Sequence, residues 1–223
     1  MKKNKTRNKK IISSVIIWIL YIVWLLKISS LTVSITNFIV HLLFLGIIVF
    51  IFKDELLENL KEFKTNTGTK ITKILLYFLV FIGIMLISNA ILSLVGVDTS
   101  QTSSSKMISN VFNNVPFGTL FACFLTIIFY PVVEELMFRK SLRPAIENGV
   151  LFVIITSLLS WYFQVTLLNP SVNEFILAIQ TLLNSIFAGI VYVRTNNIIY
   201  TISSRMLFNI LICVIQLGFL ITT

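Results

Sequence analysis

The feature that most constrains this chain is a succession of apolar segments, each close to the length of a membrane-spanning helix. A helix needs about 20 residues to cross about 30 Å of hydrocarbon, and in lipid its backbone must satisfy its own hydrogen bonds. Seven such segments fit the sequence: 11–28, 31–52, 74–97, 117–138, 149–168, 174–193 and 196–221. The sequence therefore predicts an all-α, polytopic membrane bundle of about seven transmembrane helices.

Composition supports one membrane domain over the whole chain, residues 1–223. Of its residues, 57% are hydrophobic and 12% charged, which is not the profile of a soluble globular protein. No internal repeat or Gly/Pro-rich linker divides it, so we expect a basic tail (1–10), three accessory spans (11–97) and a four-span core (115–221). The first apolar stretch is long for a signal peptide and lacks a small-residue cleavage site, which favours a retained span.

The distribution of basic residues predicts the orientation. With the N-terminus inside, the inner segments 1–10, 53–73, 139–148 and 194–195 hold 15 of the 18 Lys and Arg residues. Inner loops carry such an excess, so the sequence predicts an N-in, C-out protein of the cell membrane. The net charge of +9 then reflects orientation and contact with anionic lipid, and no nucleic-acid partner is expected. Within 53–73, the charged stretch 53–64 predicts a short helix at the membrane interface.

The segment "YPVVEELMFRKSL" (130–142) ends an apolar run with two adjacent carboxylates, Glu134 and Glu135, and with Arg139 one turn later. Ionisable groups at bilayer depth are costly and are functional candidates. Residues four apart share a helical face, so Glu135 and Arg139 are expected to pair. Glu134 is rotated about 100° from Glu135 and is expected to face a different neighbour. Other polar residues of the later spans are Ser157, Ser160, Gln164, Gln180, Asn184, Arg205 and Asn209.

These residues resemble a known family. "EELMFR" matches the EExxxR signature of the CAAX prenyl endopeptidase and bacteriocin-processing (CPBP) intramembrane proteins, also called abortive-infection proteins. "AGIVYVRTNNIIYTISSRMLFN" resembles the lead into the last family motif, and the resemblance covers about 115–215. It implies an endopeptidase site in which Glu134 and a histidine of span five activate water. A histidine and an asparagine of span seven would stabilise the oxyanion.

The sequence departs from the family at both histidines. The second motif, F-x-x-x-H, falls on Ser160 and Gln164, and the third, H-x-x-x-N, on Arg205 and Asn209. Glutamine cannot take up a proton near neutral pH, and arginine keeps its charge. Arg205 could donate to an oxyanion or pair permanently with Glu134, which would weaken that carboxylate as a base. Pairing is favoured because the two glutamates and two arginines form a neutral set.

No metal or cofactor is expected. Zinc takes three or four His, Cys or carboxylate ligands. The one histidine, His41, lies in span two and is expected to be a packed or hydrogen-bonded core residue. Of the two cysteines, only Cys213 falls near the motif residues.

The site positions carried over from the family are Glu134, Glu135, Arg139, Gln164, Arg205 and Asn209, expected to converge among spans four, five and seven. The favoured interpretation is a catalytically impaired family member that acts by binding, as a bacteriocin-immunity protein or a membrane scaffold. Its expected partners are membrane lipid and another membrane or cell-envelope protein or a peptide. One alternative is an active glutamate-dependent endopeptidase that processes prenylated-like or leader peptides. Another is an unrelated small transporter, although no inverted repeat is visible.

Overall fold

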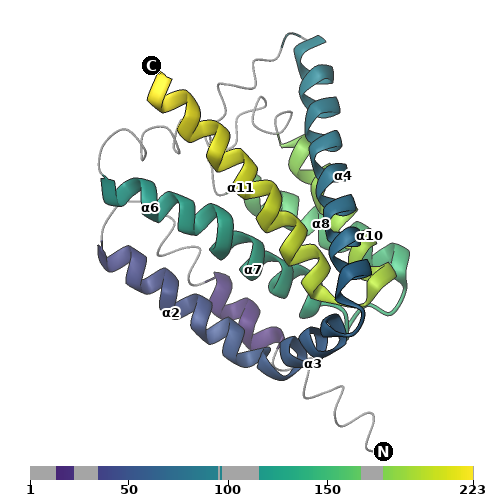
Figure 1. Cartoon of the computed structure of the whole chain (residues 1–223). Coiled ribbons are helices and arrows are strands. Elements are labelled where there is room, and N and C mark those ends of the chain that lie inside the picture. The colour runs from purple at the N-terminus through teal and green to yellow at the C-terminus, as the bar shows by residue number, and fades with distance from the viewer. Residues whose placement is uncertain (1–13, 23–34, 95, 97–115, 167–177, 223) are drawn as a thin grey trace, which may run out of the picture.

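The computed structural model describes residues 14–22, 35–94, 96, 116–166 and 178–222, and within these ranges every regular element is helical (Figure 1). The all-α prediction is therefore confirmed. The helices are α2 (Ile35–Ile51), α3 (Lys53–Lys64), α4 (Thr67–Leu94), α6 (Pro116–Phe124), α7 (Tyr130–Glu134), α8 (Gly149–Thr166), α10 (Ile179–Thr195) and α11 (Ile198–Thr222). Two π-helical segments, η2 (Leu125–Phe129) and η3 (Glu135–Lys140), flank α7, and residues 14–22 form a further helical segment.

Three described helices are long and apolar enough to cross a membrane: Thr67–Leu94, Gly118–Lys140 and Ile198–Gly218. A fourth span is possible if α2 and α3, which meet at a 73° bend, count as one. The bend falls where the sequence changes from apolar to charged, so 53–64 is a separate helix, as expected. Helix α8 is apolar but shorter. The count of seven and the orientation remain predictions, since parts of 11–28, 31–52, 74–97, 149–168 and 174–193, and the whole loop around residue 105, lie outside the described residues.

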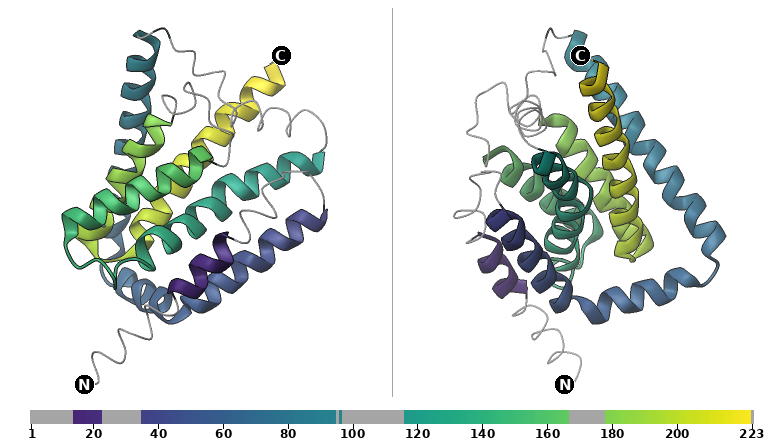
Figure 2. Two further views of the ribbon diagram at one scale, coloured as in Figure 1. Left: turned by 180° about the vertical axis from the view of Figure 1, so that it is seen from behind. Right: turned by 60° about the vertical axis from the view of Figure 1, so that its left-hand side comes forward.

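Of the segments that the sequence assigns to the cytoplasmic side, the three that the structure describes share one end of the bundle. Figures 1 and 2 place α3, the turn between η3 and α8, and the turn between α10 and α11 at this end. The last turns of α4 and α11 and the start of α6 lie at the opposite end.

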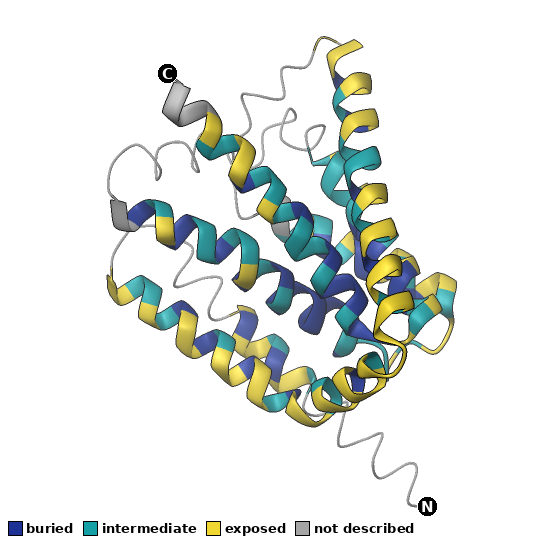
Figure 3. Cartoon of the chain, viewed as in Figure 1, coloured by how far each residue is buried: buried dark blue, intermediate teal, exposed yellow. Residues whose placement is uncertain are grey.

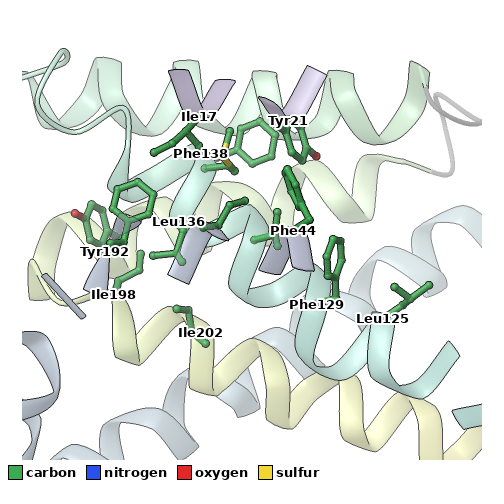
Figure 4. Packing of buried hydrophobic residues seen from close by; sticks show 14 of the residues in the cluster. Ile17, Tyr21, Phe44, Leu125, Phe129, Leu136, Phe138, Tyr192, Ile198 and Ile202 are labelled. Carbon is green, nitrogen blue, oxygen red and sulfur yellow. The ribbon is translucent and has the colours of Figure 1, made fainter. Parts of the chain in front are cut away.

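The helix that carries the paired glutamates lies at the centre of the bundle. In the apolar window of Gly118–Lys140, 56% of the residues are buried, against 17% in α4. Figure 3 shows the same concentration of buried residues around α7, while α4 is mostly exposed. Figure 4 shows Phe138 beside Ile17 and Tyr21 of the first helical segment, and Phe129 beside Phe44 of α2. The buried residues Glu134, Glu135 and Arg139 are therefore surrounded by protein, and the exposed apolar side chains lie mainly on the outer helices.

The turn between α10 and α11 positions the last helix. Asn196 has φ = 49°, a left-handed conformation that asparagine tolerates and that ends α10. The side chain of the next residue, Asn197, forms two hydrogen bonds. Its Oδ1 accepts from the backbone N–H of Ile199 at 3.0 Å, and its Nδ2 donates to the Asn59 carbonyl at 3.0 Å. The same amide nitrogen lies 3.1 Å from Glu62 Oε2. Both acceptors belong to α3, so this turn anchors the start of α11 to that helix.

Glycine allows α8 and α10 to approach closely. A Cβ placed at Gly189 would lie 3.4 Å from Val153 Cγ1 and 3.5 Å from Val153 Cα. One at Gly149 would lie 3.1 Å from Val193 Cγ1. Small residues commonly line helix contacts in membranes, where van der Waals packing drives association. This approach sets the position of α10, whose Ser185 reaches the site.

Candidate functional site

The helix that bears the glutamates departs from α-helical geometry on both sides of them. The Tyr130 N–H bonds to the Leu125 carbonyl, and the Ser141 N–H bonds to the Leu136 carbonyl at 2.9 Å, each five residues back. Such π-helical turns are rare and occur frequently at functional sites. They place Glu134 at the end of α7 and Glu135 at the start of η3, both buried.

Arg205 of α11 bridges the two glutamates. Its Nη2 donates to Glu134 Oε2 at 2.6 Å, and its Nη1 donates to Glu135 Oε1 at 2.8 Å. The Glu135 side chain is completely buried, and those of Glu134 and Arg205 are 7% and 18% exposed. The expectation that Glu134 faces a different neighbour from Glu135 is wrong: the planar guanidinium presents separate donors, which reach two carboxylates that helical rotation separates.

Arg139 lies behind Glu135 and connects the pair to α10. Its Nη1 is 3.7 Å from Glu135 Oε1, an i,i+4 ion pair with both side chains fully buried. Its Nη2 donates to the Ser185 carbonyl at 2.9 Å and lies 2.5 Å from Ser185 Oγ. Ser185 was not among the site residues predicted from the sequence. The available signal was its position next to Asn184 in a predicted span, but polarity alone did not distinguish the two.

The two predicted amide residues of the site, Asn209 and Gln164, are not placed with the charged cluster by any described contact. Asn209 lies one turn after Arg205, and its Nδ2 donates to the Thr126 carbonyl at 2.6 Å. Residue Gln164 belongs to α8, but its side chain lies outside the described part of the structure. The structure thus brings together Glu134, Glu135, Arg139 and Arg205, and it directs the Asn209 amide to the backbone of η2.

The structure also describes Ser160 and Asn184, two further polar residues of the predicted spans. Ser160, at the second-motif position, is buried in α8. Asn184 Oδ1 is buried and accepts no hydrogen bond from the described residues.

His41 packs against aromatic rings, and the two cysteines contact each other. The His41 ring is buried, packs edge-on against Phe129 with centroids 4.9 Å apart, and has Nδ1 2.6 Å from the Asn37 carbonyl. The thiols of Cys123 and Cys213 lie beside one another as free cysteines. Within the described ranges, no group of three or more His, Cys, Asp or Glu side chains is placed to hold a metal ion.

The charges of the cluster compensate one another. Two carboxylates and two guanidinium groups form a buried set without net charge, and arginine does not give up its proton. Glu135 Oε1 contacts both arginines, while Glu135 Oε2 accepts no hydrogen bond from the described residues.

Comparison with known families identifies the segment that contains this cluster. Residues 116–211 match the family model of the type II CAAX prenyl endopeptidase Rce1-like proteins. The match runs from α6 into α11 and includes every residue of the charged cluster. No curated protein and no solved structure matches the chain.

Proposed function

We propose, from the premise that residues 116–211 form an Rce1-like domain of the CAAX prenyl endopeptidase family, that this protein acts by binding and does not cleave peptides efficiently. The observation that carries the proposal is the position of Arg205, which donates to both Glu134 and Glu135. The glutamates are then the acidic half of a buried ion network. Their role is to hold α7, η3 and α11 together.

The chemistry of the replaced positions supports this assignment. Histidine changes its charge near neutral pH and can pass protons, whereas arginine and glutamine cannot. The only histidine of the chain, His41, lies outside 116–211 and packs against aromatic rings. A water near Glu134 would therefore have no histidine of this domain with which to share its proton.

A binding role places recognition on the outer surfaces of the bundle, because the charged cluster itself is buried and neutral. Helix α4 exposes apolar side chains along its length, among them Leu75, Leu79, Leu86 and Ile91. Such a face suits lipid or a helix of another membrane protein. The partner we propose is a membrane or cell-envelope protein, held in a scaffold or in a bacteriocin-immunity complex.

The experiment is a cleavage assay on purified protein in lipid nanodiscs, with a prenylated CAAX-type peptide and a leader peptide as substrates. The variants are Glu134→Gln and, as a matched control, Glu147→Gln, which removes an exposed carboxylate of the same domain. We expect no cleavage by the unaltered protein above the Glu134→Gln background. The opposite result would be cleavage by the unaltered protein that Glu134→Gln abolishes and Glu147→Gln preserves, with both variants at normal abundance. That result would establish an active endopeptidase instead.

A further inference from the structure

Pro131 leaves one backbone carbonyl of the glutamate-bearing helix without its usual donor. In an α-helix the Thr126 carbonyl would accept from the N–H of residue 130, and in a π-helix from that of residue 131. The Tyr130 N–H instead bonds to the Leu125 carbonyl. Residue 131 is proline, which has no N–H. Neither helical register therefore supplies a hydrogen bond to this oxygen.

An unpaired carbonyl within the bilayer is unfavourable, since hydrocarbon offers no replacement donor. The replacement comes from a different helix. Asn209 Nδ2 lies 2.6 Å from the Thr126 carbonyl oxygen, across 83 positions of sequence. Arg205 lies one turn before Asn209, so one face of α11 supplies both the cation for the glutamates and the amide for the helix that carries them.

We propose that Asn209 is a positioning residue that replaces the backbone donor lost at Pro131 and thereby fixes η2. Each residue inserted by a π turn rotates the following side chains by about 100° relative to the preceding helix. Holding η2 in the π register therefore holds Glu134 and Glu135 in the orientation that meets Arg205. This role is independent of whether the domain cleaves peptides, because it depends only on the contacts of Thr126, Pro131 and Asn209.

A double-mutant cycle tests the inference. Asn209→Leu keeps a side chain of similar size but removes the donor, and Pro131→Ala supplies an N–H at position 131. We expect Asn209→Leu alone to lower the melting temperature in nanodiscs by several degrees. In the Pro131→Ala background, the same change should lower it by less than half as much, because the new N–H can bond to Thr126 in the π register. Equal losses in both backgrounds would overturn the proposal.

A site-specific signal separates positioning from a general loss of packing. Threonine labelled with ¹³C at the carbonyl, combined with ¹⁵N-isoleucine, selects the two Thr–Ile bonds of the chain, Thr126–Ile127 and Thr201–Ile202. Asn209→Leu should shift the Thr126 carbonyl resonance and leave that of Thr201 in place, and Pro131→Ala should return it. A Thr126 resonance that does not move would contradict the role.

Folding failure of Asn209→Leu would not leave the inference untested. Its rescue by Pro131→Ala would support the role, and failure of the double variant as well, with Pro131→Ala alone folded, would refute it.

Discussion

Arg205 and Glu135 lie 70 positions apart in the sequence, yet Nη1 of the one donates to Oε1 of the other at 2.8 Å in the interior of the bundle. The same guanidinium holds Glu134, and Glu135 in turn contacts Arg139. The last helix of the chain is therefore tied to the centre of the bundle through charge. A network of this kind stabilises only while every charge has its counter-charge.

Removing Arg205 should be strongly destabilising. Arg205→Met would leave two buried carboxylates with one buried arginine, and loss of one member of a buried ion pair typically costs about 3–5 kcal/mol. The measurement is the free energy of unfolding in detergent, with Arg194→Met, an exposed arginine of α10, as the control. Adding Glu134→Gln should recover part of the loss, because Glu135 and Arg139 then remain as a neutral ion pair. A loss no greater than that of the control would show that the bridge is not structural.

Ser185→Ala should produce a smaller effect. The substitution removes the hydroxyl 2.5 Å from Arg139 but keeps the backbone carbonyl that accepts from the same nitrogen. A hydrogen bond to a charged group contributes about 1.5–3 kcal/mol, so the loss should lie near the lower figure. Thermal unfolding would measure it, and Ser203→Ala, a half-buried serine of α11, is the comparison. If the two serine variants lower the melting temperature equally, the hydroxyl of Ser185 has no special role in stabilising Arg139.

Restoring the two histidines of the family motifs tests whether their absence is what prevents catalysis. The double change Gln164→His and Arg205→His restores a group that can exchange protons at each position. We expect measurable cleavage of a prenylated or leader peptide by the double variant, provided that its abundance remains normal, and none by either single variant. The control adds Glu134→Gln to the double variant. A folded double variant without cleavage would show that other features of the site also prevent the reaction.

The predicted orientation can be tested by labelling. Single cysteines near residue 5, within 60–70 and near residue 145 should be protected from an impermeant thiol reagent in intact cells. Those near residue 105 and at the C-terminus should react. The physical basis is the concentration of Lys and Arg in the first three segments. Protection of the C-terminus would contradict the seven-span arrangement.

The sequence by itself determined the features that depend on composition and short spacing. Long apolar segments require helices in lipid, and the change to charged residues at Lys53 ends α2 and begins α3. The spacing of four between Glu135 and Arg139 places them on one face, and the structure contains that pair. The EExxxR resemblance depended on the identity of residues within one helical turn, and the family match includes that segment.

The charge count already favoured a pair between Arg205 and Glu134, which the structure contains, but only the tertiary structure decided that the same arginine also serves Glu135 and which groups satisfy the irregular backbone. Arg205 donates to both glutamates, Arg139 donates to the Ser185 carbonyl, and Asn209 donates to the Thr126 carbonyl. All of these contacts follow from how α10 and α11 pack against the central helix. These contacts join residues 46 to 83 positions apart. Local pattern carries no information about such distances. The π registers of η2 and η3 were likewise invisible in the sequence, because apolar periodicity does not distinguish a bond to the fourth preceding residue from one to the fifth.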